Sequence, residues 1–242
     1  METQLTTKKE TAPVAYDTTS RAIWDEGDVY SSSDIRIPRI TLVGNGSQLA
    51  NEGKGSPGQI LNSDGYTLLA DKNQQLEVLP ISVMTDWVKF QKIGANADFQ
   101  KVSVVALPPS NLLTDKWTTD IVEEDKIPTV YKKRISCYVL SPSNDMVIPF
   151  TVSFKGLSAF SGSAISSHFQ MSRAQGVPPI GNVFTLSSKL VEWNGKKHWA
   201  LEAVKGRVTT DHEKAMAVKW RSTIMSKKVE VSTEEDHEEA PF

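Results

Sequence analysis

Two candidate β-hairpins separated by one helical segment constrain the fold of this chain more than any other feature of its sequence. In the second hairpin, two alternating segments flank Asn194-Gly195, which is the strongest two-residue hairpin signal. In the first, the linker SPSND is rich in residues that favour turns. Apolar and polar residues alternate on both sides of each turn, so the sequence predicts four antiparallel strands. The expected strands are 130–140 with 146–154, and 182–193 with 196–208.

A long strand is expected before the first hairpin, over LEVLPISVMTDWVKFQK (76–92). Its alternating apolar residues change parity part-way along, and we therefore expect a β-bulge near Thr85-Asp86. The residues expected to share one face before that bulge are Leu79, Ile81 and Val83.

Two helices are expected around the second hairpin. The segment 156–176 has apolar residues at largely helical spacing and ends at Gly176, which favours a helix C-terminus. Thr210 and Glu213 form a capping box, which predicts a helix through about Ser226. The apolar residues at helical spacing in the first helix are Leu157, Phe160, Ala164, Ile165, Phe169 and Met171.

The order strand, hairpin, helix, hairpin, helix predicts a mainly β fold with α-helices. A five-stranded Greek-key barrel of the oligonucleotide/oligosaccharide-binding (OB) type has this order, with a helix between its third and fourth strands. We expect such an OB-fold-like barrel with insertions and a C-terminal helix. The expected divisions are 1–33 as a disordered or extended N-terminal segment, 34–228 as an OB-like nucleic-acid-binding core, and 229–242 as an acidic disordered tail.

The sequence contains no recognisable pattern of catalytic residues. Its four His residues are scattered without metal-ligand spacing, and no Gly-x-Ser-x-Gly motif occurs. The Gly-rich loop 44–58 fails both phosphate-binding patterns, because Leu49 replaces a required Gly and Gly55 follows Lys54. The sequence therefore predicts no enzyme activity, no cofactor and no metal site.

Cysteine usage and hydropathy indicate the compartment. The single Cys137 excludes an internal disulfide, suits a reducing environment, and falls in an apolar strand pattern as a core residue. No apolar run is long enough to span a membrane, and the first residues lack the apolar region of a secretory signal. We expect a cytoplasmic protein with no membrane partner.

Charge is distributed unevenly along the chain. Six of the 29 acidic residues, but none of the 27 Lys and Arg residues, lie in 230–242, so the rest of the chain carries four more basic than acidic residues. A mildly basic body with an acidic segment often accompanies nucleic-acid binding.

Cations and aromatic rings are interleaved on the expected strands. In 130–140, Ile135, Cys137 and Val139 have the core parity, which leaves the opposite parity facing outward. Single-stranded DNA needs cations for its phosphates and rings on which bases stack. The candidate DNA-binding residues are Trp87, Lys89, Phe90, Lys92, Lys132, Arg134, Tyr138, Trp193, Lys196, Lys197, Trp199, Lys205 and Arg207. For Trp87, Phe90 and Trp199, a core position is an equal alternative, whereas Tyr138 and Trp193 are expected to be exposed.

The sequence resembles single-stranded-DNA-binding proteins encoded by tailed bacteriophages. The resemblance depends on IPRITLV (37–43), LEVLPISVMTDWVKF (76–90), the hairpin–helix–hairpin of 130–208 and the ending EEDHEEAPF. It implies an OB fold, no catalysis, a role in DNA replication, recombination and repair, and a location in the cytoplasm of the infected bacterial host. The segment 93–129 is not explained by the resemblance.

The acidic ending is expected to bind partners. Its acids attract basic surfaces, and Pro241 and Phe242 suit an apolar pocket, so we expect it to recruit replication or recombination proteins and to compete with DNA. Deletion of 230–242 should then tighten DNA binding at low salt. The candidate partner-binding residues are Glu234, Glu235, Asp236, Glu238, Glu239, Pro241 and Phe242.

Three alternatives to a strand-protecting protein remain open. A phage structural or assembly protein would use the acidic tail only for solubility. A recombination mediator that anneals strands would share the binding surface but would need to form a homo-oligomer. A metal-dependent nuclease is disfavoured, because the sequence lacks spaced carboxylates on its expected strands.

Overall fold

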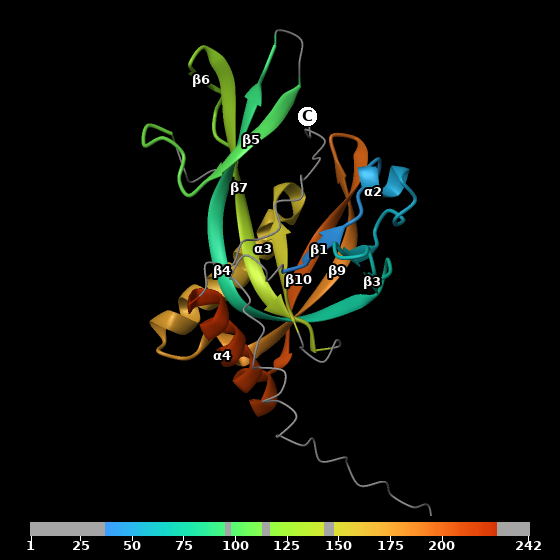
Figure 1. Cartoon of the computed structure of the whole chain (residues 1–242), viewed down its shortest axis with the longest axis vertical. Coiled ribbons are helices and arrows are strands. Elements are labelled where there is room, and N and C mark those ends of the chain that lie inside the picture. Colours follow the sequence, from blue (N-terminus) through green and yellow to red (C-terminus); the bar gives the residue numbers. More distant parts are fainter. Residues whose placement is uncertain (1–36, 95–97, 113–116, 143–147, 227–242) are drawn as a thin grey trace, which may run out of the picture.

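The computed structural model describes residues 37–94, 98–112, 117–142 and 148–226. They form a mainly β structure in which one strongly curled sheet is covered by two long helices (Figure 1). The strands are β1 (Arg39–Leu42), β2 (Ile60–Asn62), β3 (Leu68–Ala70), β4 (Gln75–Lys92), β5 (Phe99–Val105), β6 (Val122–Glu124), β7 (Ile127–Leu140), β8 (Pro149–Phe154), β9 (Asn182–Trp193) and β10 (Lys196–Val208). The helices are α2 (Gln48–Asn51), α3 (Ala159–Ala174) and α4 (Asp211–Ser226), with short 3₁₀ turns η3 (Gly156–Ser158) and η4 (Pro179–Gly181).

The expected elements after residue 70 occur in the expected order: β4, the β7–β8 pair, α3, the β9–β10 hairpin and α4. Two further strands, β5 and β6, lie between β4 and β7. In the sheet, the strands lie in the order β10-β9-β4-β7-β8-β1-β2-β3, with β5 added to β4 and β6 added to β7. Neighbouring strands are antiparallel except β1 and β8, which are parallel.

Closure of the sheet differs from the expected five-stranded barrel. Within the described residues no pairing joins β8 to β10; β1 pairs with β8 instead. The segment after β1 then reaches β10, where the Asn45 side chain donates to the Lys197 carbonyl (2.7 Å) and Gly58 lies against the Trp199 ring. The β1–β2 region therefore lies between the two strands that a five-stranded barrel would pair directly.

The core inside the curled sheet follows the predicted parity of β7. Ile135, Cys137 and Val139 are buried there together with side chains of β8, α3, β9 and β10. These partners include Phe150, Val152, Phe154, Ile165, Phe169, Phe184, Leu186 and Leu201. The first hairpin is shorter than expected, because Ile148 precedes β8 and is 44 % exposed, and Met146 is outside the described residues.

The bulge in β4 lies earlier than expected. The register with β7 shifts between Pro80 and Ser82, not near Thr85. As a result Leu79 and Ile81 point away from the inner core, whereas Val83 packs against it. A bulge bends a strand and increases its twist, and β4 curves strongly along its length in Figure 1.

Helix α4 packs on the outer face of the sheet, over parts of β4 and β7. Leu79, Ile81 and Leu140 form a second buried cluster there with Ala217 and Ile224 of the helix. Tyr138 belongs to this cluster and is only 5 % exposed, so the prediction of an exposed Tyr138 is wrong. Its parity is as predicted, but the outward face at this point is occupied by α4.

Helix α3 packs against β10, β7 and β8 through a narrow stripe that includes Gly162, Ile165 and Phe169. Gly162 lies so close to β8 that an added Cβ would be 2.7 Å from Phe154 Cβ. Phe160 and Met171, at largely helical spacing in the sequence, are 78 % and 62 % exposed because they fall outside this stripe.

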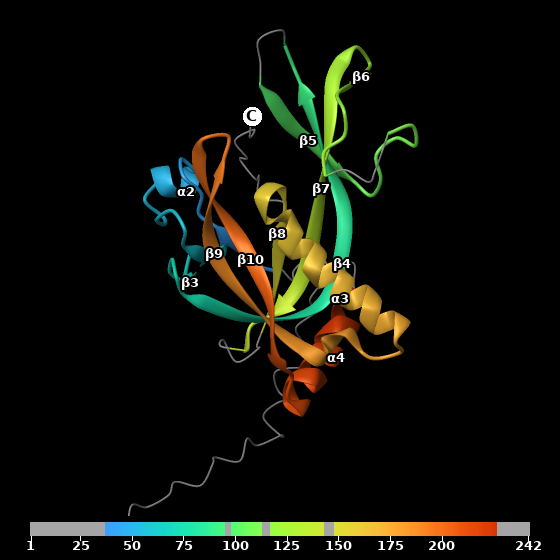
Figure 2. The same ribbon diagram turned by 180° about the vertical axis from the view of Figure 1, so that it is seen from behind.

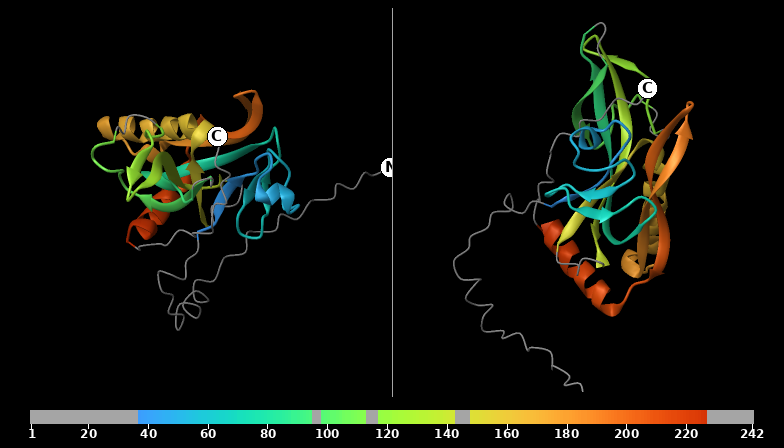
Figure 3. Two further views of the ribbon diagram at one scale, coloured as in Figure 1. Left: turned by 90° about the horizontal axis from the view of Figure 1, so that it is seen from above. Right: turned by 90° about the vertical axis from the view of Figure 1, so that its right-hand side faces the viewer.

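Two β projections extend from the same end of the sheet. One consists of β5, β6 and the adjoining parts of β4 and β7; we call it the arm. The other is the β9–β10 hairpin. Figures 1 and 2 show both at the upper end of the molecule, and the right-hand panel of Figure 3 shows α4 at the opposite end. None of the helices in the described ranges is both long and apolar enough to cross a membrane.

Candidate nucleic-acid interface

Trp87 and Phe90, both predicted as possible base-stacking rings, are core residues of the arm. Each is 2 % exposed. Phe90 packs with Val88, Val130 and Phe99 between β4, β5 and β7. The core alternative is therefore the one observed, since neither ring has a face open to a base.

Three predicted cations of the arm have partners within the protein. Lys89 forms an ion pair with Glu124 (2.6 Å), and that carboxylate also accepts a hydrogen bond from the Tyr131 hydroxyl (2.5 Å). These two contacts hold the pKa of Glu124 below its ordinary value, with Lys89 the larger cause. Arg134 pairs with Asp86 across the strands, and Lys132 Nζ lies 5.0 Å from the centre of the Phe90 ring. Burial lowers the pKa of Lys132.

A cluster that the sequence analysis missed lies on the opposite face of the arm, where it meets α3. Lys133 Nζ is 5.4 Å from the Trp117 ring centre and 5.9 Å from that of Trp87, so the ammonium lies near two indole rings. Trp117 also contacts Phe160, with ring centres 6.4 Å apart. We call Lys133, Trp117 and Phe160 the arm cluster. Phe160 is 78 % exposed, so the cluster presents one aromatic ring at the surface, next to the Trp117 ring that Lys133 contacts.

The arm cluster was missed for an identifiable reason. Lys133 lies on the same side of β7 as the buried residues Ile135, Cys137 and Val139. At Lys133, however, β7 has already extended beyond the core, so this side of the strand is open to other contacts. Trp117 lies in the excursion 93–129, where the sequence has no periodic pattern; its backbone carbonyl accepts from the Lys133 amide (2.7 Å). A Trp flanked on both sides by polar residues was the only available signal.

The tip of the β9–β10 hairpin carries four predicted residues, but on two faces. Asn194 and Gly195 have φ of 50° and 72°, which fits the predicted two-residue turn. Trp193 lies directly opposite Lys196 and is 58 % exposed. The next pair along is Lys197 with Glu192, on the other face.

Trp199 shares that other face of the hairpin. It lies opposite Leu190, and its ring packs against Gly58, which has a φ of +92° and no side chain. Trp199 is half-buried, so it is neither a fully buried core residue nor a fully exposed base-stacking ring, the two alternatives for this position. Trp193 is therefore the exposed aromatic residue that the hairpin offers to a ligand.

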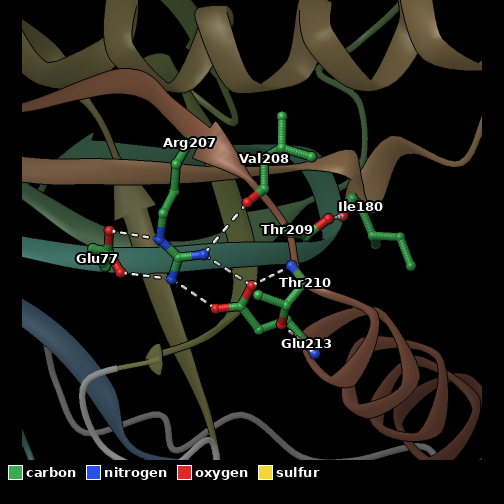
Figure 4. Close-up of polar contacts among 7 residues, drawn as sticks. All are labelled: Glu77, Ile180, Arg207, Val208, Thr209, Thr210 and Glu213. Atoms are coloured by element: carbon green, nitrogen blue, oxygen red, sulfur yellow. Dashed lines mark hydrogen bonds and ion pairs between the residues drawn. The ribbon is translucent and has the colours of Figure 1, made fainter.

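Lys205 and Arg207 lie at the far end of β10, away from the hairpin tip. Arg207 donates to Glu77 of β4 (2.8 and 3.0 Å) and to Glu213 of α4 (2.7 and 2.9 Å), as Figure 4 shows. Lys205 lines a cavity between α3 and α4. β10 spans 13 residues, so these two cations lie at the opposite end of the strand from the predicted DNA-binding residues Lys196 and Lys197.

Lys92 and the predicted partner-binding residues are the remaining candidate site residues. Lys92 lies at the end of β4, where it lines a shallow cavity with Lys126 and Pro128. The expected partner-binding residues of 229–242 are outside the described residues, and their role stays a prediction.

The described part of the chain contains no candidate metal site. Its His, Cys, Asp and Glu residues form no cluster of three suited to a metal ion. Cys137 is buried, and burial raises the pKa of its thiol to about 12, so the reactive thiolate does not form near neutral pH.

Comparison of the sequence with protein-family models and with curated proteins, and of the fold with solved structures, finds no significant match.

Proposed function

We propose that this protein binds single-stranded DNA without sequence specificity and acts in DNA replication, recombination and repair. The observation that carries the proposal is the common position of the arm and the β9–β10 hairpin, which leave the same end of the curled sheet (Figures 1 and 2). The arm bears the Lys133–Trp117–Phe160 cluster and the hairpin bears Trp193 beside Lys196.

An OB-type topology supports this assignment. If β4, β7, β8, β9 and β10 are the five strands, α3 falls between the third and fourth, and the pairs β4–β7, β7–β8, β4–β9 and β9–β10 are those of an OB sheet. The arm is then the connection between the first and second strands, and the hairpin tip connects the fourth and fifth. In OB folds these two connections contact oligonucleotides. In an OB barrel the third and fifth strands pair directly; here β1 would take that place beside β8.

The chemistry of the two projections suits an unpaired strand of any sequence. Every base has a π-face, so an exposed ring such as Trp193 or Phe160 can stack on each of them, at about 1–3 kcal/mol per base. Lys196 and Lys197 can neutralise phosphates and release counterions. Neither interaction depends on which base is present.

A titration with a labelled oligo-dT strand and with a matched duplex tests the proposal. We expect preference for the single strand, quenching of Trp fluorescence on binding, and weaker binding as salt rises. Equal or no binding to the two DNA forms would overturn it. Further proposals that depend on it are recruitment of replication or recombination proteins, formation of a homo-oligomer, and action in the cytoplasm of a phage-infected bacterium.

A second candidate is a phage structural or assembly protein. The observation that favours it is that the arm carries five exposed apolar side chains, because such side chains, where they gather, are typical of protein–protein contacts. Indifference to DNA, together with assembly that depends on these side chains, would favour this function. The residues concerned are Ile93, Val102, Val104, Leu107 and Ile121, which are 43–74 % exposed.

A further inference from the structure

An open apolar cavity lies between the C-terminal half of α3, the start of β9 and the first turns of α4, with a volume of about 860 Å³. Its apolar lining includes Met171, Val177 and Val218, which are 62 %, 48 % and 58 % exposed. We call it the α3–α4 groove. The C-terminal half of α3 and helix α4, which line it, lie at the end of the molecule opposite the arm and the tip of the β9–β10 hairpin (Figures 1 and 2).

The charged groups of the α3–α4 groove are cationic. Lys205 of β10 and Lys214 of α4 line it, and His168 is the third titratable group of the lining. His168 lies 3.1 Å from the Pro179 carbonyl, and burial lowers the pKa of its ring. Among the described residues that line the groove there is no Asp or Glu; Asp211, at the rim, pairs with Lys214 at an exposed position (3.1 Å).

We propose that the α3–α4 groove is the docking site of this chain's own acidic segment, residues 230–242, with its acids against Lys205 and Lys214 and Phe242 on the apolar lining. The segment has the complementary composition: six acids, no Lys or Arg, and one aromatic ring. An apolar lining that includes two lysines and no carboxylate fits a ligand that combines an apolar anchor with several carboxylates.

The length of the connecting chain allows this contact. Helix α4 ends at Ser226, and its groove residues Val218 and Lys214 lie 8 and 12 residues earlier, or about 12 and 18 Å along the axis. The 16 residues that follow can span up to about 50 Å. The segment can therefore turn back along α4, and its tethering raises its effective concentration to the millimolar range.

The docking proposal does not depend on DNA binding. A segment held in the α3–α4 groove is at the other end of the molecule from the projections, so groove docking differs from direct competition with DNA. Each can fail without the other: the oligo-dT titration tests DNA binding, and the position of the segment tests docking.

Paramagnetic relaxation in the full chain locates the segment. A nitroxide is attached to Ala240→Cys; Cys137 is buried and does not compete for the label. We expect loss of methyl intensity at Met171, Val177 and Val218. No loss at these methyls, or loss instead at Leu190 and Val191 of the hairpin, would overturn the proposal.

Two variants of α4 test whether docking requires the groove itself or is affected by any new negative charge on the helix. Val218→Asp should abolish the loss at Met171 and Val177, whereas Met225→Asp, equally exposed on α4 but outside the groove lining, should preserve it. Phe242→Ala and the pair Lys205→Glu with Lys214→Glu should also reduce it. Finally, chain that carries the isotope label but no nitroxide is mixed with chain that carries the nitroxide but no isotope label. The methyl signals should then lose no intensity. A loss in this mixture would mean docking onto a second copy and would overturn the intramolecular site.

Discussion

Arg134 on β7 lies directly opposite Asp86 on β4, and its guanidinium donates two hydrogen bonds to the carboxylate, Nε to Oδ1 at 2.8 Å and Nη2 to Oδ2 at 2.7 Å. The two side chains are 13 % and 20 % exposed. Arg134, a candidate phosphate contact in the sequence analysis, is thus paired with Asp86 within the sheet, and its first role is structural.

Removing either partner of this pair should destabilise the protein. We expect Arg134→Ala and Asp86→Ala each to lower the free energy of unfolding by about 1–3 kcal/mol, because the remaining charge stays largely buried without its two hydrogen bonds. Urea unfolding of both single variants and the double variant measures the coupling. Loss of the exposed Lys189–Glu202 pair is the control and should cost under about 1 kcal/mol. An Arg134→Ala protein of unchanged stability would contradict the structural role.

Gly162→Ala should destabilise the protein although alanine favours helices. In an exposed helix the change would stabilise by about 1 kcal/mol. Here the new Cβ would lie 2.7 Å from Phe154 Cβ and 3.0 Å from Ile135 Cβ, and these atoms are attached directly to the backbone. Overpacking of this kind costs about 1–3 kcal/mol, so the net change should be a loss. Thermal unfolding checks it; Gln170→Ala, exposed on the same helix, should be close to neutral.

Local patterns in the sequence predicted several elements correctly, because their causes lie within a few residues. The alternation of Ile135, Cys137 and Val139 identified the inner face of β7. The capping box is present as expected: Thr210 N donates to Glu213 Oε2 (2.7 Å) and Glu213 N to Thr210 Oγ1 (3.2 Å).

The candidate site was predicted less well, because exposure depends on contacts between distant segments. Alternation places Tyr138 on the outer face, but only the position of α4, more than 70 residues later, shows that this face is covered. The arm cluster joins Trp117, Lys133 and Phe160, from three separate elements or loops, and no local pattern links them. Likewise, the partners of Arg207 come from β4 and α4.

Stability should fall in acid through Glu213. Its hydrogen bonds from Arg207, the larger cause, and from Thr210 hold the pKa of the carboxyl at about 2, below its ordinary value of 4.5. Because the folded-state pKa is depressed, the stabilisation is complete above about pH 4.5 and is lost as the pH falls from there toward 2. The contribution should be about 2 kcal/mol.

Urea unfolding at pH 7 and pH 3 measures this contribution. Between the two values the unaltered protein should lose more stability than Glu213→Gln, whose amide cannot titrate. Glu202→Gln serves as the control, because this exposed residue pairs only weakly with Lys189; its acid dependence should match that of the unaltered protein. Equal losses in the unaltered protein and Glu213→Gln would show that the Arg207–Glu213 contact does not stabilise the fold.

Trp193→Ala should weaken binding of single-stranded DNA without changing stability. The ring is 58 % exposed, so its removal leaves little apolar area uncovered, whereas loss of one stacked base should lower the affinity by about 1–3 kcal/mol. Oligo-dT titration measures the affinity, and part of the fluorescence quenching should disappear. The dependence on salt should stay the same, since no charge is altered; Lys196→Ala, in contrast, should reduce the salt slope by about one.

Leu190→Ala is the matched control for Trp193. Leu190 belongs to the same hairpin and is 44 % exposed, but lies on the opposite face, opposite Trp199. If the outward face of the hairpin contacts the strand, Leu190→Ala should bind as the unaltered protein does. Equal affinities of all three proteins would exclude the hairpin as a DNA contact, and a loss in Leu190→Ala alone would place the strand against the Trp199 face.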